Sequence, residues 1–272
     1  MDLLAQDGHV SSPTIKHSEK GPRVEFTRIG RNHASTFTGF CSTHDAEIFR
    51  AIDQHPLDRN NMEQLFLLAY RAVARELHAV MEGAARIQGT YQYRVERGYD
   101  SGTATDSAGQ LATAHLIKSY DTYRYRCDNF DRPLLLKSYK EIQHDVFVLL
   151  GQVPVIAASA TFSLDGLAGM DGTPRATLNI LPTSQTETIV IFSYSEKHSG
   201  TVRTGLNRIF QAGGDYQKYE ISKLMLESTE NFVISPSHFD SWPKDKKEPV
   251  RSEFERTLLG GSVIEDAGLM LF

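Results

Sequence analysis

The sequence is poor in cysteine. It holds Cys41 and Cys127 in 272 residues, and no Cys-x-x-Cys pair occurs in it. A chain of this length buries enough apolar surface to fold without disulfides, whereas secreted, disulfide-built domains are short and dense in cysteine. We therefore expect both thiols to be free or metal-bound, as in a reducing cytoplasm.

Long apolar runs are also missing. The longest, at residues 146–150 and 189–192, are far below the roughly 20 residues that a helix needs to cross a bilayer. Residues 1–10 have neither the basic stretch nor the apolar stretch of a secretory leader. We expect a cytoplasmic protein with no membrane contact.

There is no excess of basic residues and no nucleotide motif. The formal net charge is −5, which argues against a molecule that binds polyanions over its whole surface, although it permits a local basic patch. The glycines at residues 166–169 and 213–214 match neither a Walker loop nor a dinucleotide fingerprint. We interpret them as turns.

The sequence does contain a clear helical pattern in its first half. Residues 62–87 place apolar side chains at spacings of three and four, which predicts one long amphipathic helix. Residues 107–143 have a second helical pattern, which Pro133 must interrupt or kink. The polar linker between them predicts an antiparallel helix pair. A strand at residues 24–29, a short strand at 34–40 and a helix at 45–52 are expected before this pair.

The second half is rich in strand patterns. Four runs separated by glycine, proline and aspartate predict three or four antiparallel strands at residues 146–150, 155–164, 176–181 and 188–195. Helices are expected at residues 201–211, 215–232 and 248–259. Segregated helices and strands favour an α+β fold, divided into a small element at 1–57 and a main domain at 58–272. Residues 1–22 are expected to be poorly anchored.

Cys41 and His44 have the C-x2-H spacing of half a zinc site. A thiolate and an imidazole three residues apart, where the chain enters a helix, can reach one ion at roughly 2.0–2.3 Å. Zinc takes four ligands in a structural site, and upstream only His9, His17 and His33 are available, at spacings that match no zinc motif.

The alternative for the same cluster is structural. In this interpretation Cys41 is a small buried side chain. Ser42 caps the following helix, and His44 and Asp45 form hydrogen bonds near its N-terminus.

Residues 34–49 contain a Phe-Cys-x-x-His-Asp element at positions 40–45. This stretch resembles a signature of uncharacterised bacterial proteins, and residues 188–193 and 230–236 are similar to later segments of the same group. The resemblance implies a module like the treble-clef and HNH zinc modules, in which a Cys-x-x-Cys knuckle and a Ser-His segment precede this element. Cys41 and His44 would be its metal ligands, and the present chain would lack the knuckle or begin after it.

Two polar clusters are further catalytic candidates. Ser193, Ser195, Lys197 and His198 follow a strand, but they lack the motifs that position a serine nucleophile, so a polar strand end is the favoured interpretation. His238 lies near Asp240 and Trp242, where a carboxylate could tune a histidine base. The alternative there is a helix C-terminal turn closed by Pro236.

Basic and aromatic residues alternate on the expected helix pair, as in some nucleic-acid grooves. The basic side chains are Arg71, Arg75, His78, Arg86, Arg124 and Arg126, and the aromatic ones are Tyr120, Tyr123 and Tyr125. We favour a solvated helix face whose tyrosines cover the core.

Three functions follow from these features. The first is an accessory protein that contacts an unidentified protein partner in a bacterial system such as phage defence, favoured because no complete catalytic set is present. The second is a degenerate HNH-like nuclease or nucleic-acid-binding protein with His44 and Asp45 at its site. The third is a hydrolase that uses His238 or His198 as a base. For the cofactor we expect either none or a zinc ion, and nucleic acid is the less favoured partner.

Overall fold

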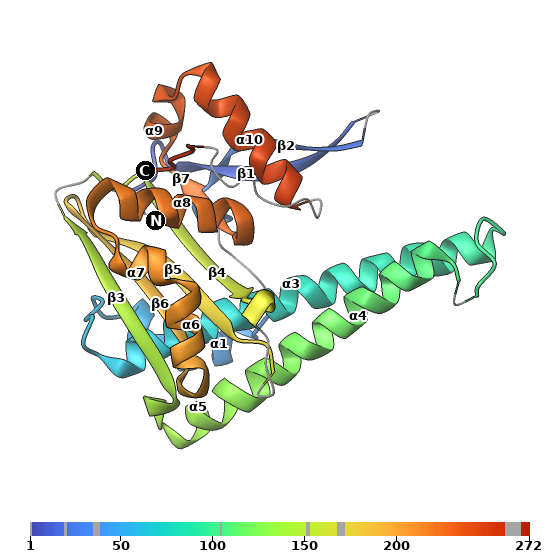
Figure 1. The fold of residues 1–272 in the computed structure, drawn as a ribbon, viewed down its shortest axis with the longest axis horizontal. Helices are drawn as coiled ribbons and strands as arrows, with labels where there is room; N and C mark the ends of the chain where they lie inside the picture. The colour runs from blue at the N-terminus through green and yellow to red at the C-terminus, as the bar shows by residue number, and fades with distance from the viewer. Residues whose placement is uncertain are drawn as a thin grey trace. The chain divides into compact units, whose positions relative to one another are not determined.

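The computed structural model describes residues 2–18, 21–34, 39–103, 105–150, 153–167, 172–258 and 268–272. These residues form two compact units. One joins Met1–Thr36 to Ile142–Phe272 and is called the sheet unit. The other, Phe37–Glu141, is called the helical unit. The helical unit is inserted in the chain between the second and third strands of the sheet unit (Figure 1).

An antiparallel sheet of seven strands is the framework of the sheet unit. Its strands lie in the order β2 (Gly21–Gly30), β1 (His9–Ser18), β7 (Phe232–Ile234), β4 (Ile156–Ser163), β5 (Arg175–Ser184), β6 (Glu187–Ser195) and β3 (Ile142–Leu150). The short β7 connects the N-terminal hairpin to the later strands, because Ile234 pairs with Ser11 on one side and with Ile156 on the other. Segments from both ends of the chain therefore share one sheet.

Helices cover one face of this sheet and build its core. They are α6 (Ser199–Gly205), α7 (Asn207–Gln211), α8 (Gly214–Ser228), α9 (Pro236–Ser241) and α10 (Lys244–Leu258) (Figure 1). Phe192 is fully buried and lies edge-on to Phe147 and Phe210, with ring centroids 6.2 and 5.4 Å away. Burial of apolar area stabilises a fold by about 25 cal/mol per Å², so this core is the main source of the unit's stability.

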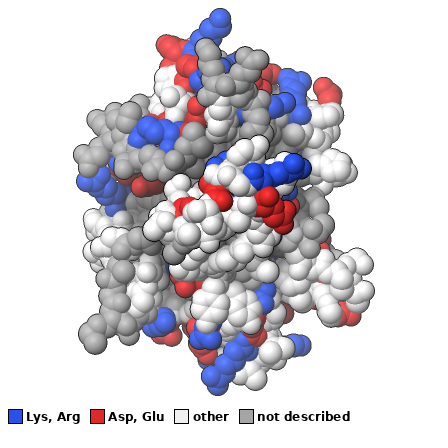
Figure 2. Space-filling view, turned by 90° about the vertical axis from the view of Figure 1, so that its right-hand side faces the viewer, with Lys and Arg blue, Asp and Glu red and all other residues white. Residues whose placement is uncertain are grey.

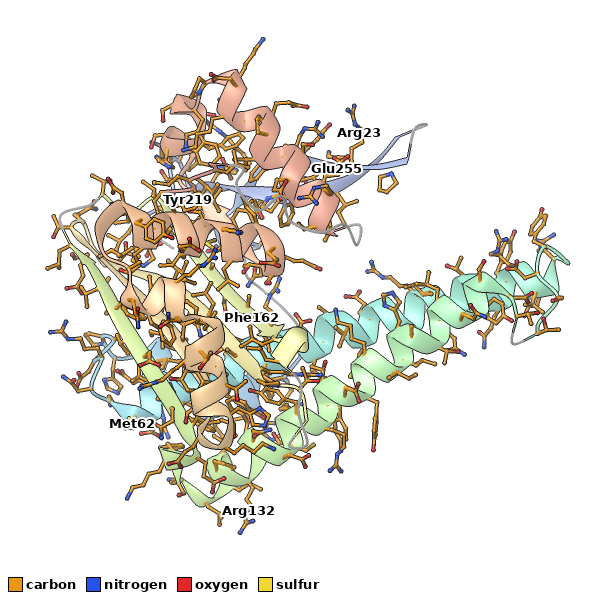
Figure 3. All side chains as sticks on the ribbon, in the orientation of Figure 1. Arg23, Met62, Arg132, Phe162, Tyr219 and Glu255 are labelled. Atoms are coloured by element: carbon orange, nitrogen blue, oxygen red, sulfur yellow. The ribbon has the colours of Figure 1, made fainter. Side chains whose placement is uncertain are left out.

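Polar groups tie the helices to the sheet. Glu255 of α10 accepts a hydrogen bond from the backbone N–H of Val24 at 2.9 Å, and Figure 3 shows Glu255 beside the part of β2 that carries Arg23. The buried Tyr194 hydroxyl donates to Asp145 on the neighbouring strand β3 and accepts from Arg203 Nε of α6 at 2.8 Å. Burial and the bond to Asp145 raise the pKa of Tyr194 to about 12.

The helical unit begins with α1 (Ser42–Ile48) and α2 (Arg50–Asp53). The long helix α3 (Met62–Glu96) then pairs with α4 (Ser107–Arg126), which continues through a π-helical turn (Cys127–Asp131) into α5 (Arg132–Leu136). A 3₁₀ turn (Tyr139–Glu141) ends the unit. Asn61 starts α3, because its side chain accepts hydrogen bonds from the N–H groups of Glu63 and Gln64 at 3.0 and 3.2 Å.

Aromatic side chains make the core at the base of the helical unit. Neighbouring rings lie with centroids 4.8 to 6.3 Å apart; the residues are Phe40, Phe49, Phe66, Tyr70, Tyr125, Phe130 and Tyr139. The π-helical turn brings Phe130 into this cluster. Met62, at the start of α3, and Arg132, at the start of α5, mark this base in Figure 3.

The α+β class predicted from the sequence is confirmed. The long helix and the four later strands are also present, with α3 extending to Glu96. Other predictions were wrong. The opening segment is strand β1 rather than loose chain, and Pro236 begins α9 instead of closing a turn. The helix expected at 215–232 ends at Ser228, and Phe232 begins strand β7.

The strand expected at residues 34–40 falls largely on 35–38, outside the described residues. In place of the single helix expected at 45–52 there are two short helices, α1 and α2. The helix expected at 107–143 ends earlier, at Leu136. The predicted division into 1–57 and 58–272 differs from the two units, because β1 pairs with β7 near the other end of the chain.

Candidate functional site

The α3–α4 hairpin packs along a seam that has mostly large side chains on α3 and, apart from one histidine, small ones on α4. In the second half of α3, buried and half-buried residues recur at spacings of three and four: Leu77, Val80, Ala84, Ile87 and Tyr91. The matching residues of α4 are Ala108, Ala112, His115, Ser119 and Thr122. This is the repeat of a two-stranded coiled coil, in which each helix turns one stripe toward the other.

The seam fixes Gly109 opposite Tyr91. A Cβ on Gly109 would lie 2.9 Å from the end of the Tyr91 side chain, so a larger residue there would displace that ring. The Tyr91 hydroxyl donates to Asp106 at 3.3 Å. Asp106 also accepts from Ser101 Oγ and the Gly102 N–H at 2.7 and 2.8 Å, and these bonds, led by Ser101, lower its pKa. The turn at the hairpin tip is thus closed by internal hydrogen bonds.

The large apolar side chains of α4 lie outside this seam. Leu116, Tyr120 and Tyr123 follow one another at spacings of four and three, and Ile117 lies beside them. They are between 44% and 60% exposed. A helix that buries an alanine and a threonine while exposing leucine, isoleucine and tyrosine reverses the usual amphipathic pattern. Contiguous exposed apolar side chains of this kind mark interaction sites.

Met81 of α3 extends this surface. Met81 comes one residue after the seam residue Val80, and Leu116 comes one residue after the seam residue His115. In an antiparallel pair of helices, residues that directly follow seam positions lie on the same flank, so Met81 and Leu116 share one flank of the hairpin. Since Tyr91 lies against Gly109 and the helices run antiparallel, Met81 is level with α4 between Leu116 and Tyr123. We call Met81, Leu116, Ile117, Tyr120 and Tyr123 the outer stripe. Figure 3 shows side chains projecting from both helices of the hairpin along its length.

The structure bears on two interpretations of the basic and aromatic residues of the helix pair, a core cover of tyrosines and a nucleic-acid groove. Tyr120, Tyr123 and Tyr125 were expected to cover the core; Tyr125 packs edge-on against Phe130 there, but Tyr120 and Tyr123 are exposed. The nearby arginines are engaged by carboxylates: Arg71 with Asp53 at 2.7 Å, Arg86 with Glu82 at 2.6 Å, Arg124 with Asp128 at 3.1 Å and Arg126 with Asp131 at 3.3 Å. Figure 2 shows basic and acidic side chains next to one another on the face that it draws. This charge pattern is unlike the single-sign groove of a nucleic-acid-binding protein.

Cys41 and His44 are brought together at the start of α1. The Cys41 Sγ and His44 Nδ1 atoms are 3.2 Å apart, and both side chains are exposed. The structural interpretation of this cluster was therefore wrong in two respects: Cys41 is not buried, and Cys41 rather than Ser42 occupies the N-cap position, with no side-chain capping bond. Asp45 lies in the first turn and is half-buried.

The pair supplies two of the four ligands of a structural zinc site. Within the described ranges, no three His, Cys, Asp or Glu side chains come together in a way that would hold a metal ion. Two exposed donors do not make a closed tetrahedral site, so the donor set present does not fit a resident zinc ion.

A polar hollow of about 720 Å³ lies beside α1 and α2 in the helical unit. Its wall includes Glu47, Arg50, His55, Gln54, Asn61, Glu63, Lys137 and Tyr139. The buried Gln64 at its floor accepts from the Asp58 N–H at 2.7 Å and donates to the carbonyls of Ala51 and Pro56 at 2.8 and 3.0 Å. Gln64 thereby holds the loop between α2 and α3, and the mixed charges around the hollow favour no single class of ligand.

The two histidines proposed as bases have structural surroundings. His238 Nε2 donates to the Leu271 carbonyl at 3.0 Å, and its ring lies edge-on to Trp242. Burial lowers the pKa of His238. Asp240 pairs with Arg28 at 2.6 Å, which gives it a partner other than that histidine. His198 is buried in a 3₁₀ turn (Glu196–His198) after β6.

The sequence did not predict the histidine that contacts Ser193. His144 of β3 lies opposite Ser193 of β6 in the sheet, and its Nδ1 is 2.8 Å from the serine Oγ. Burial lowers the pKa of His144 to about 4. Thr177 and Thr161 continue the same row across β5 and β4. This row is a ladder of polar side chains on one sheet face, and period-two alternation in the strands was the signal that could have revealed it.

Comparison of the chain with protein-family models, curated proteins and solved structures gave no match. No helix in the described part of the chain has both the length and the apolar character needed to cross a membrane. Function is therefore inferred from the side chains of this molecule.

Proposed function

We propose that this chain is a non-catalytic interaction protein whose contact element is the α3–α4 hairpin. The observation that carries the proposal is the outer stripe, in which α4 exposes Leu116, Tyr120 and Tyr123 while it buries small side chains. Tyrosine and methionine are enriched in protein–protein interfaces, and tyrosine is among the few residue types that carry most of the binding energy there. A bacterial defence system as the setting stays a prediction.

The hairpin also has the stiffness that a contact element needs. Its tip is closed around Asp106, and Arg94 binds Asp100 through two hydrogen bonds of 2.6 and 3.1 Å. A pre-ordered surface loses less conformational entropy on binding than a mobile one. The candidate bases His238 and His198 have structural surroundings, since His238 donates a hydrogen bond to the Leu271 carbonyl and His198 is buried in a 3₁₀ turn, which favours binding over catalysis.

Site-specific photo-cross-linking tests this function. A photoreactive amino acid at Tyr120 should trap a partner protein in the cells that make the chain, whereas one at Leu111 should not. Leu111 is a matched control, because it is also half exposed on α4 but lies outside the outer stripe. The partner should be lost in Tyr120→Glu and kept in Leu111→Glu. Equal cross-linking from both positions would contradict the proposal.

The thiol–imidazole pair supports a second candidate, a degenerate HNH-like nucleic-acid-binding protein. The observation that favours this candidate is the distance of 3.2 Å between Cys41 Sγ and His44 Nδ1. Elemental analysis of purified protein would support it if stoichiometric zinc is present and is lost in His44→Ala. A folded, metal-free protein would remove it.

A further inference from the structure

We propose that the partner seated on the outer stripe is a second copy of this chain, with the two α4 helices packed antiparallel across a two-fold axis near Tyr120. The inference rests on the proposed interaction function and names its partner. The spacing of the stripe indicates a helix as the occupant, because residues that recur at four and three fill the holes between residues of a facing helix. The stripe is also continuous with the α3–α4 seam, so a third helix would extend packing that already exists.

The stripe is complementary to itself in the antiparallel direction. With Tyr120 on the axis, a residue three positions before it faces a residue three positions after it in the other copy. Ile117 then packs on Tyr123 of the other copy, and the two Tyr120 rings meet in an offset stack. The resulting contact is apolar at its centre and is the same surface on both copies, as a two-fold interface requires.

The charge of Arg124 favours an antiparallel over a parallel arrangement of the two α4 helices. Arg124 lies at the edge of the stripe, one helical turn from Tyr120. A parallel contact would place the two Arg124 side chains together, whereas the antiparallel contact places each over Leu116 of the other copy. Each Arg124 already has Asp128 as its counter-ion at 3.1 Å, so no unpaired charge enters the interface.

The area is that of a weak dimer. Each outer-stripe side chain is about half exposed and presents roughly 100 Å², so two copies would bury about 1,000 Å² in total, near the lower limit for a specific interface. A contact of this size gives an affinity in the micromolar range more readily than a permanent assembly. We therefore expect association that depends on protein concentration.

Sedimentation equilibrium of the purified full-length chain from about 1 to 100 µM tests the inference. The mass should rise from that of the 30.5 kDa monomer toward twice that value. Tyr120→Glu should raise the dissociation constant at least about tenfold, and Leu111→Glu should leave it within about twofold. Both positions are exposed, and circular dichroism will show whether each variant keeps its helix content.

Cysteine cross-linking locates the axis. In a Cys41→Ser, Cys127→Ser background, Tyr120→Cys should form an intermolecular disulfide on mild oxidation, and Leu111→Cys should not. A monomer at all concentrations would overturn the inference. If the monomeric chain still photo-cross-links another protein through position 120, the interaction function stands and the second copy is wrong. If neither result appears, both proposals fail.

Discussion

The two units of this protein treat apolar side chains differently. Among the described residues, sixteen large apolar side chains are exposed, and eleven of them belong to the helical unit although it is the shorter one. In the sheet unit the exposed ones are scattered, as on most protein surfaces. In the helical unit five of them form the outer stripe. The sheet unit therefore buries most of its large apolar residues in its core, whereas the hairpin leaves part of its own exposed.

Truncating one large side chain in each unit should give the largest difference in the free energy of unfolding. Phe192→Ala should lower the free energy of unfolding by about 4 kcal/mol, because it opens a cavity among packed rings. Tyr120→Ala should change it by less than about 0.5 kcal/mol, because the side chain is exposed. Urea unfolding measures both. A large loss for Tyr120→Ala in a monomeric sample would mean that the stripe is part of the folding core.

The helical unit has its own buried polar anchor. Gln64→Met keeps the side-chain volume but removes the three hydrogen bonds to Asp58, Ala51 and Pro56, and we expect a loss of about 3 kcal/mol. Gln88→Met, on the half-buried flank of the same helix, is the control and should cost less than about 0.5 kcal/mol. Thermal unfolding followed by circular dichroism at 222 nm compares them. Equal melting temperatures would show that the α2–α3 loop does not depend on Gln64.

Acid should act on the sheet unit through His144. Its pKa is about 4 in the folded protein and near 6.5 when unfolded, so the unfolded chain binds the proton first as the pH falls. The folded state is then penalised as the pH drops from 6.5 toward 4, by about 2 kcal/mol between pH 7 and pH 5. Hydrogen exchange at β3 and β6 should show this loss in the wild type and a smaller loss in His144→Gln.

His44→Gln provides the control for that experiment. His44 is exposed, so its replacement should leave the pH dependence of β3 and β6 unchanged. If His144→Gln keeps the full acid dependence, other carboxyl or imidazole groups carry it and the burial of His144 is not its cause.

Two glycine substitutions in the hairpin should have the smallest effects, and these effects should be unequal. Gly89→Ala, in open space on α3, should stabilise the hairpin by up to about 1 kcal/mol because alanine favours the helix. Gly109→Ala should gain less than Gly89→Ala, since the new methyl group must displace the end of the Tyr91 side chain from Asp106, which offsets the helix preference of alanine. Melting temperatures compare the two. An equal gain for both variants would show that the contact between Tyr91 and Gly109 does not contribute to the stability of the seam.

The sequence predicts which segments form helices and strands better than it predicts which of these segments pack or pair with one another. Residues 62–87 are a helix from local spacing alone, and the strands after residue 146 follow from β-branched runs. β7 has three residues and lies between strands from distant parts of the chain, so no local pattern distinguishes it from the end of α8. The two units follow from that long-range pairing and could not be predicted.

The candidate site was only half predictable. The approach of Cys41 to His44 follows from their spacing, and it is observed at 3.2 Å. The outer stripe was missed because Tyr120 and Tyr123 were assigned to the core. Reading α4 for two stripes, one of small residues and one of large residues beside it, would have separated the seam from the exposed surface. Which stripe faces α3 depends on Tyr91 and Gly109, which are distant in sequence.

Oxidative footprinting of tyrosines tests the role of the outer stripe most directly. The hairpin carries its own reference residues, because Tyr93 and Tyr99 are exposed outside the stripe while Tyr120 and Tyr123 lie within it. In concentrated protein, labelling of Tyr120 and Tyr123 should be suppressed and should recover on dilution, with Tyr93 and Tyr99 labelled equally under both conditions. Equal labelling of all four tyrosines at every concentration would contradict the account of α4 as a contact surface between copies.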